Sequence, residues 1–312
     1  MILVTGASGF VGHAVAIEAA RRGWKVRAAA RRAQQFPGTT IETRVAPDLE
    51  ASSDWSGLVA GIDTVIHAAA RVHVMRDTAS DPLQEFRRVN VEGTVRLARQ
   101  AAQVGVRRFV FISSIKVNGE ANVGGAPVRA SDTPAPIDPY GISKHEAEQA
   151  LRRVEAETGM EVVVIRPVLV YGPGVRANFA AMMRWVRRGV PLPFGAVHNR
   201  RSLVALPNLV DLILACVQHP QAAGQTFLVS DGEDLSTTDL LRRIARATGA
   251  PSRLLPVPAG LMEFGAGLLG RGDLARRLLG SLQVDITATR ERLGWSPPCS
   301  VDAALRETAG SR

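Results

Sequence analysis

Cysteine, lysine and tyrosine are all scarce in this chain of 312 residues. The two cysteines, Cys216 and Cys299, lie far apart and lack the spacing of metal-binding or redox pairs, so the sequence predicts no metal site and no disulfide framework. No apolar run is long enough to cross a bilayer. The chain starts directly with the apolar strand Met1–Thr5, which leaves no room for a secretion signal. We therefore expect a cytoplasmic protein without membrane insertion.

Negative charge is also in short supply. The 38 basic residues, nearly all arginines, outnumber the 29 acidic ones and give a net charge of +9. These arginines are scattered and do not alternate with aromatic residues, so we expect no nucleic-acid partner. Small anionic ligands such as phosphates explain the excess of arginine better. The length suits one large α/β domain with a smaller second lobe.

A glycine motif follows the first strand at once. The pattern G-x-x-G-x-x-G begins at Gly6 and leads into an alanine-rich helix that runs to about Arg22. Glycines at these positions permit a tight turn and let a pyrophosphate approach the N-terminus of the helix. The strand before it and the helix after it are the context that this motif requires. We therefore predict cofactor contacts from Gly6, Ser8, Gly9, Phe10, Val11 and Gly12.

The end of the second strand, Lys25–Ala30, bears on the choice of cofactor. It continues as Arg31-Arg32, with no carboxylate. An acidic residue here binds the ribose diol of NAD, whereas an arginine accommodates the 2′-phosphate of NADP. We therefore expect NADP(H) in preference to NAD(H), with two solvated arginines as the alternative. Other strand ends are predicted to supply the remaining cofactor contacts, which are Asp48, Leu49, His67, Ala68, Ala69, Pro167 and Val170.

Strands and helices alternate along most of the chain. This order predicts the α/β class, with a Rossmann-type, doubly wound parallel sheet and a smaller C-terminal substrate-binding lobe. Predicted strand ends in such a sheet face one ligand crevice. We assign residues 1–170 to the dinucleotide-binding domain, with 201–229 returning to it, and residues 171–200 and 230–312 to the second lobe.

The stretch Pro139–Lys144 carries the clearest chemistry. It places Tyr140 and Lys144 four residues apart at the start of a predicted helix, on one face. A lysine charge beside a tyrosine lowers the pKa of the phenol from its ordinary value of about 10, which helps it to carry a proton. A plain surface helix is the alternative. The chain has only two tyrosines and three lysines, which makes a chance pairing uncommon.

Together these motifs resemble the extended short-chain dehydrogenase/reductases, specifically the NAD-dependent epimerase/dehydratase branch that acts on nucleotide sugars. The likeness rests on the glycine motif, His67-Ala-Ala, Ser113-Ser114, Tyr140-x-x-x-Lys144 and Arg166-Pro167 through Gly174. It implies that Tyr140 is the general acid/base, that Lys144 holds the nicotinamide ribose, and that Ser114 bonds the reacting oxygen. Ser114 matches because it lies five residues before Gly119 in a Ser-x-x-Val-Tyr-Gly pattern. Asn118 replaces the tyrosine of that pattern.

The resemblance also implies a UDP-sugar substrate in the second lobe. Asn178 and Phe179 match a segment that meets the diphosphate, and Arg201 matches an arginine that pairs with it. A guanidinium suits such a group. Capping or packing is the alternative for Phe179 and for Arg276, a candidate second phosphate clamp. The other predicted substrate contacts are Ser113, Lys116, Asn118, Leu192, Pro193 and Phe194.

The segments that follow Asn199, Asn208 and Phe227 narrow the likeness to bacterial O-antigen and capsule enzymes that reduce the 4-keto group of a UDP-2-acetamido-2,6-dideoxy-hexos-4-ulose. We therefore expect a reductase. One alternative is a UDP-hexose 4-epimerase with the same triad and a retained NAD. Another is a non-catalytic NADP(H)-binding sensor, although the Tyr–Lys pair argues against it. The resemblance further implies a homodimer through the helices at 81–104 and 140–158.

Overall fold

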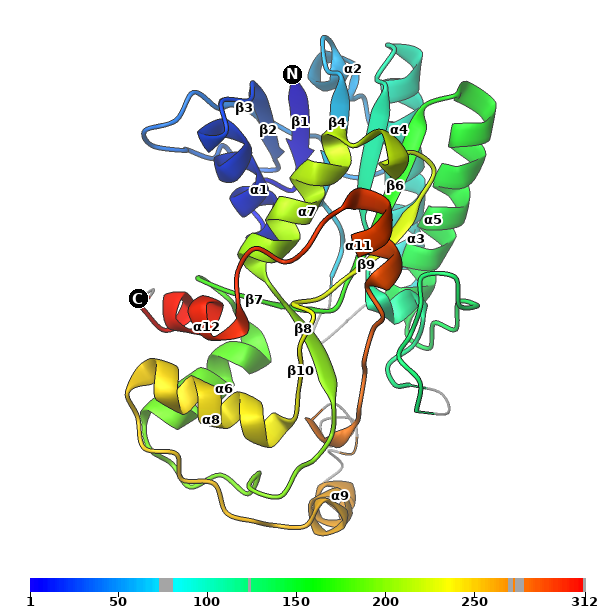
Figure 1. Cartoon of the computed structure of the whole chain (residues 1–312). Helices are drawn as coiled ribbons and strands as arrows, with labels where there is room; N and C mark the ends of the chain where they lie inside the picture. Colours follow the sequence, from blue (N-terminus) through cyan, green and yellow to red (C-terminus); the bar gives the residue numbers. More distant parts are fainter. Residues whose placement is uncertain (73–80, 123–124, 269–271, 273–277, 311–312) are drawn as a thin grey trace.

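The structure is a computed structural model that describes residues 1–72, 81–122, 125–268, 272 and 278–310 (Figure 1). Seven strands form one parallel sheet in the order β3-β2-β1-β4-β5-β6-β9. This arrangement confirms the predicted Rossmann-type fold. The strands are β1 (Ile2–Thr5), β2 (Val26–Ala30), β3 (Glu42–Val45), β4 (Thr64–His67), β5 (Arg108–Ile112), β6 (Glu161–Pro167) and β9 (Thr226–Val229).

Helices cover both faces of the large sheet, which explains why its central strands are buried and mostly apolar. Every residue of β1, β4 and β5 is buried. One core packs the sheet against α1 (Phe10–Arg21) and α7 (Leu206–Gln218). A second core packs the other face against α2 (Ser56–Val59), α4 (Thr94–Gln103) and α5 (Pro139–Thr158). Only the edge strand β3 is largely exposed.

The predicted helix at 81–104 contains an interruption. Asp81 caps its start by accepting a hydrogen bond from the Gln84 backbone at 3.1 Å, and α3 then spans Pro82–Arg87. A π-helical segment, Arg88–Gly93, follows and continues into α4. An added Cβ at Gly93 would lie 2.5 Å from the Leu49 carbonyl carbon, so this segment packs directly on the backbone beyond β3.

A smaller, mixed sheet lies below the large one in Figure 1, with strand order β10-β8-β7. A third core joins it to helices α6 (Ala177–Arg187), α8 (Thr237–Thr248) and α12 (Val301–Gly310). Strand β9 belongs to the large sheet, whereas β8 belongs to the small one; the functional division into domains stays a prediction. The strands are β7 (Leu169–Tyr171), β8 (Arg201–Ala205) and β10 (Asp234–Leu235).

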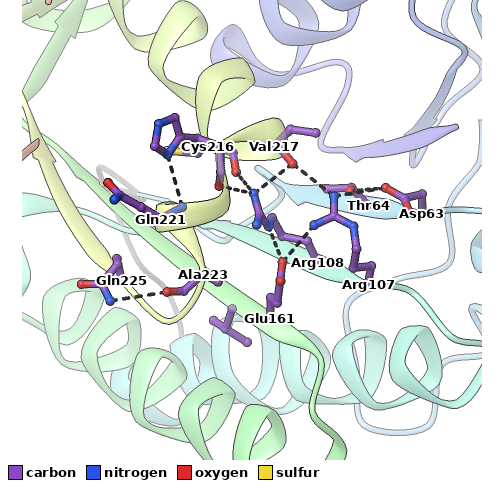
Figure 2. Close-up of polar contacts among 12 residues, drawn as sticks. Asp63, Thr64, Arg107, Arg108, Glu161, Cys216, Val217, Gln221, Ala223 and Gln225 are labelled. Atoms are coloured by element: carbon purple, nitrogen blue, oxygen red, sulfur yellow. Dashed lines mark hydrogen bonds and ion pairs between the residues drawn. The ribbon is translucent and has the colours of Figure 1, made fainter. Parts of the chain in front are cut away.

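A buried arginine closes the end of the large sheet where β5 begins (Figure 2). Arg108 is 1% exposed, and its Nη1 donates to the carbonyls of Cys216, Val217 and His219 at 2.7, 3.0 and 2.9 Å. Its Nε donates to Glu161 at 2.7 Å. Carbonyls at the C-terminus of a helix lack intrahelical partners and carry partial negative charge, so Arg108 caps α7 and ties it to β5 and β6.

Candidate active site

The glycine turn after β1 is built for close approach. Gly6 has a φ of +67°, and an added Cβ there would lie 2.7 Å from the Ala69 nitrogen. An added Cβ at Gly12 would lie 2.3 Å from the Gly6 carbonyl oxygen. Gly9 is the N-cap of α1 and supplies no side-chain cap, so the N–H groups of the first turn remain open to an anion. The turn therefore fits the pyrophosphate of a dinucleotide.

An open cleft of about 850 Å³ borders the glycine turn. Ser8, Gly9 and Phe10 line one side, and the loop of Pro173 and Gly174 lines another. Neither Tyr140 nor Lys144 borders this cleft, so it is not the place where proton transfer would occur. The predicted contacts Ser8 and Phe10 are thus accessible from the side of the small sheet.

The residues predicted to select the cofactor lie at the carboxyl ends of β2 and β3. Arg31 and Arg32 follow β2 directly, are exposed, and form no ion pair within the described part of the chain. Asp48 is exposed, and Leu49 is partly buried beneath Gly93. Their contacts with a cofactor stay predictions. Pro167 is buried at the end of β6, and Val170 is partly buried in β7.

The N-terminus of α5, which carries Tyr140 and Lys144, is fixed by a helix cap and by a close backbone contact. Asp138 caps the helix by accepting a hydrogen bond from the Gly141 backbone at 2.7 Å, and Pro139 occupies the first helical position. An added Cβ at Gly141 would lie 2.8 Å from the Lys116 carbonyl oxygen, so this end of α5 rests on the turn that follows β5. That contact brings Tyr140 beside Ser114, and their side chains are hydrogen-bonded.

Burial sets the charge state of the pair. It raises the pKa of Tyr140 above the ordinary value, with help from the negative charge of Asp138, while the hydrogen bond with Ser114 acts in the opposite direction. Burial also lowers the pKa of Lys144 to about 7, against the attraction of Glu148. The Lys144 ammonium lies 4.0 Å from the ring centroid of Phe111. The sequence argument expected Lys144 to lower the pKa of Tyr140, but burial raises this pKa, and Lys144 is not among the groups that shift it.

We expect Lys144→Met to stabilise the nucleotide-free protein at pH 7 by roughly 2 kcal/mol or more, because it removes a buried cation. Unfolded lysine keeps its proton up to about pH 10, whereas folded Lys144 releases it near pH 7. The unfolded state therefore binds more protons in this window, and the stability of the wild type rises with pH. The advantage of the variant should narrow between pH 7 and pH 9.

Urea unfolding at these two pH values measures the effect. The matched control is Lys25→Met, at an exposed lysine, which should leave both the stability and its pH dependence close to those of the wild type. A Lys144→Met protein that is no more stable at pH 7, or that keeps a constant difference up to pH 9, would contradict the assignment of Lys144 as a buried, readily deprotonated group.

A buried polar network that the sequence did not reveal lies next to Tyr140 and Lys144. Glu148, one helical turn beyond Lys144, accepts hydrogen bonds from Arg166 Nε and Nη2 at 3.0 and 2.5 Å. Ser113 donates to the same carboxylate, and Arg166 Nη1 donates to Asn118 at 2.9 Å. Ser113 and Asn118 therefore have structural partners of their own. The Asn118 amide nitrogen is buried and has no hydrogen-bond partner among the residues that the structure describes.

Asn90 is a second residue whose place was not foreseen. Its amide nitrogen donates to the Arg71 carbonyl and to the Ser143 hydroxyl, both at 3.0 Å, and its oxygen accepts from the Arg71 backbone at 2.8 Å. Ser143 in turn donates to the Tyr140 carbonyl at 2.8 Å. Asn90 thus connects the segment after β4 to the helix turn that carries Tyr140. Its π-helical setting has no signal in the sequence, although such segments are frequent at functional sites.

His67 is a packing residue at the end of β4. It is fully buried and hydrogen-bonded to Thr5 and Thr94 at 2.7 and 3.0 Å. Burial, together with the charge of Lys144, lowers the pKa of His67 to about 3, so the imidazole is neutral. Ala68 and Ala69, which follow it, face Gly6 closely.

The predicted substrate contacts occupy varied surroundings. Lys116 forms ion pairs with Asp138 and Glu120, so its charge is already matched. Arg201 in β8 is partly buried, which lowers its pKa against the attraction of the Glu120 charge, and its guanidinium donates to the Gly280 carbonyl at 3.0 Å. A partly buried guanidinium with one carbonyl acceptor can still bind an anionic ligand. Arg276 lies outside the described residues.

The remaining substrate candidates lie in the small lobe. Asn178 is exposed at the start of α6, whereas Phe179 is 2% exposed and stacks on Tyr171 with a centroid distance of 5.2 Å. Leu192 is buried and pairs with the backbone at Arg253 and Leu255. Pro193 is exposed and Phe194 is partly buried. No group of metal-ligating side chains occurs among the residues that the structure describes, and no helix there is long and apolar enough to span a membrane.

Comparisons with known proteins agree with this geometry. A sequence model of the NAD dependent epimerase/dehydratase family matches residues 2–230. A UDP-glucose 4-epimerase from Vibrio cholerae is 48% identical over 311 residues, which cover 99% of this chain and 94% of the relative. A 3-beta-hydroxysteroid dehydrogenase from Mycolicibacterium neoaurum is 31% identical, over 98% of this chain and 89% of the relative. The solved structure of MoeE5 in complex with UDP-glucuronic acid and NAD matches with a TM-score of 0.79 and 25% identity, over 99% of this chain and 97% of that one.

Fold and site together define a dinucleotide-dependent enzyme of the extended short-chain dehydrogenase/reductase type. The chain belongs to the NAD-dependent epimerase/dehydratase family. This confirms the family predicted from the sequence. The narrower expectation of a 4-keto reductase receives less support than its alternative, because the relative with 48% identity is an epimerase. The preference for NADP(H) is likewise unsupported, since the family is NAD-dependent and MoeE5 binds NAD.

Proposed function

We propose that this protein is a UDP-hexose 4-epimerase that retains NAD(H) throughout its turnover. The observation that carries the proposal is the 48% identity with a UDP-glucose 4-epimerase over 99% of this chain. The pairing of Tyr140 with Ser114 is compatible with it. The glycine turn of Gly6, Gly9 and Gly12 would hold the cofactor pyrophosphate, and an added side chain at Gly6 or Gly12 would clash with the backbone that forms this turn.

The bound nicotinamide supplies reversible hydride exchange with C4 of the sugar. Tyr140 removes the proton from the 4-hydroxyl as C4 is oxidised and returns it when C4 is reduced from the other face. Ser114 holds the same oxygen and orients it toward the phenol. Lys144 has a pKa of about 7, so it gains or loses a proton easily near neutrality and can stabilise the phenolate when charged.

Two features support a nucleotide diphosphate as the handle of the substrate. Arg201 offers a partly buried guanidinium that donates to the Gly280 carbonyl and lies near the charge of Glu120. Asn178 is exposed at the start of α6, where an incoming ligand can reach it. The name of the steroid dehydrogenase relative suggests an apolar alcohol as the substrate of that protein. Such a substrate would need neither Arg201 nor Asn178. The substrate we propose is therefore a UDP-hexose such as UDP-glucose or UDP-N-acetylglucosamine.

The direct test is to incubate the purified protein with UDP-glucose or UDP-N-acetylglucosamine and no added cofactor. We expect the corresponding galacto-configured sugar to form, and denatured protein to release about one equivalent of NAD(H). No interconversion of either sugar, in protein shown to contain nicotinamide, would contradict the epimerase proposal. Release of NADP(H) instead would show that the cofactor assignment is wrong while leaving the reaction open.

The 4-keto reductase with NADPH is the second candidate, and Arg31 and Arg32 are the observation that favours it. Both are exposed at the end of β2, a position at which this sequence has no acidic residue to bind the ribose diol of NAD. Net oxidation of NADPH by the protein with a UDP-4-keto-6-deoxy-N-acetylhexosamine, without any UDP-hexose epimerisation, would support this reaction. We further propose a homodimer through the helices at 81–104, which comprise α3, the π-helical segment and α4, together with α5, against which they pack.

A further inference from the structure

Helix α9, Ala259–Leu268, is more apolar and more exposed than a helix of a single globular chain should be. Glu263 is its only charged residue. Leu261 and Phe264 are nevertheless 64% and 68% exposed, and Leu255, on the segment that leads into α9, is 52% exposed. A helix that is apolar on most of its surface is normally buried. An exposed group of large apolar side chains marks a surface that meets something else.

The approach to α9 is held in place by a short backbone ladder. Leu192 donates to the Arg253 carbonyl at 2.9 Å, and Leu255 donates to the Leu192 carbonyl at 2.8 Å. Gly195 donates to the Leu255 carbonyl at 2.8 Å, and an added Cβ at Gly195 would lie 2.8 Å from the Leu255 carbonyl carbon. Figure 1 shows α9 at the bottom of the view, at the end of the small lobe away from the large sheet. The apolar side chains are therefore presented on a defined platform.

The chain segments that form this backbone ladder are rich in positive charge. The two segments joined by the ladder, residues 184–200 and 250–268, contain one carboxylate, Glu263, and five arginines, all exposed. The whole chain, these arginines included, has a net charge of +9. The arginines are Arg184, Arg187, Arg188, Arg200 and Arg253.

We infer that the α9 face, which comprises Leu255, Leu261 and Phe264, docks onto the surface of an anionic lipid bilayer. Exposed apolar side chains on α9 and exposed arginines on the segments that support it are the two elements of interfacial binding, since the former enter the acyl boundary while the latter meet negative headgroups. Ten residues of helix span about 15 Å, half of the hydrocarbon core, so α9 lies on a membrane and does not cross it. A second copy fits this face poorly, because a symmetric contact would bring its arginines together.

Sedimentation with lipid vesicles tests the inference on the full chain. We expect the wild type to bind vesicles that contain phosphatidylglycerol, to bind pure phosphatidylcholine vesicles at least about tenfold more weakly, and to lose binding as salt rises. The double variant Leu261→Ser/Phe264→Ser should bind the anionic vesicles at least about tenfold more weakly than the wild type. The matched control is Val45→Ser/Ile137→Ser, at exposed apolar residues elsewhere, which should bind like the wild type.

Several results would overturn the inference: no binding of the wild type to anionic vesicles, equal binding of the double variant, or loss of binding in the control. A larger mass in solution that falls in the double variant alone would assign the α9 face to a second copy. The inference does not rest on the proposed function. The double variant is expected to keep its activity on a water-soluble UDP-hexose, so failure of the epimerase assay and failure of the vesicle assay are separate outcomes.

Discussion

Tyr140→Phe is expected to lower kcat by about 10²–10⁴-fold, the usual contribution of a positioned proton carrier. The ring stays, and with it the contact that places Phe86 and Tyr140 edge to face at 6.1 Å, but the hydroxyl that is hydrogen-bonded to Ser114 is lost. Phenylalanine keeps the buried ring and removes only the hydroxyl, so the fold should stay intact, at a cost of about 1–3 kcal/mol for the Ser114 hydroxyl that loses its partner. The change therefore falls on chemistry and leaves the affinity for the UDP-sugar nearly unaltered.

The other tyrosine of the chain is the matched control. Tyr171 is buried in the third core, which includes no residue of α5, and donates to Asp231 at 2.9 Å. Tyr171→Phe leaves a buried carboxylate short of one donor and should cost about 1–3 kcal/mol of stability, while kcat changes little. Steady-state kinetics and thermal unfolding of both variants provide the comparison. Equal activity of Tyr140→Phe and the wild type would refute the catalytic assignment.

Arg108→Met is expected to destabilise the fold by about 3–5 kcal/mol, the largest stability effect that we predict for a residue remote from the active site. The substitution leaves the Cys216 and His219 carbonyls without the cation that caps them, leaves Val217 with only the longer bond from Arg107 at 3.3 Å, and removes a partner of Glu161 (Figure 2). A carbonyl that is buried without a partner costs about 1–3 kcal/mol. Methionine fills much of the volume, so the loss reflects polar contacts.

Arg107→Met is the control for this prediction. Arg107 is the preceding residue and pairs with Glu161 and Asp63 at 2.9 and 3.5 Å, but its side chain is 45% exposed. Exposed ion pairs contribute up to about 1 kcal/mol. Chemical unfolding of both variants should therefore separate them by 2 kcal/mol or more. Similar losses for Arg107→Met and Arg108→Met would mean that the buried cap does not stabilise α7.

Local patterns were sufficient to predict the sheet, because the strands of a doubly wound fold are continuous apolar runs between helices. They were also sufficient to predict the glycine turn, since Gly6 and Gly12 are required by backbone contacts that any chain making this turn must satisfy. Tyr140 and Lys144 lie on one helix, so their proximity follows from spacing alone.

Features that depend on contacts between distant segments were beyond such patterns. Glu148 has the appearance of an ordinary surface helix residue in the sequence, and only the fold buries it against Arg166. Asn90 gains its partners from a π-helical segment that no spacing indicates. The expectation for Tyr140 was incomplete for the same reason, because its pKa depends on burial, and burial is a property of the assembled core. The sequence also could not show that Lys116 already has two carboxylate partners.

The most direct test of the central claim follows the hydrogen on C4. UDP-glucose labelled with deuterium at C4 is incubated with the purified protein, and the product is analysed by mass spectrometry and NMR. If the protein is an epimerase that retains its cofactor, the deuterium should return to C4 of UDP-galactose, with none lost to solvent and none released on free nicotinamide. Deuterium that accumulates on released nicotinamide, with no labelled UDP-galactose, would show a net dehydrogenase or reductase and contradict the proposal.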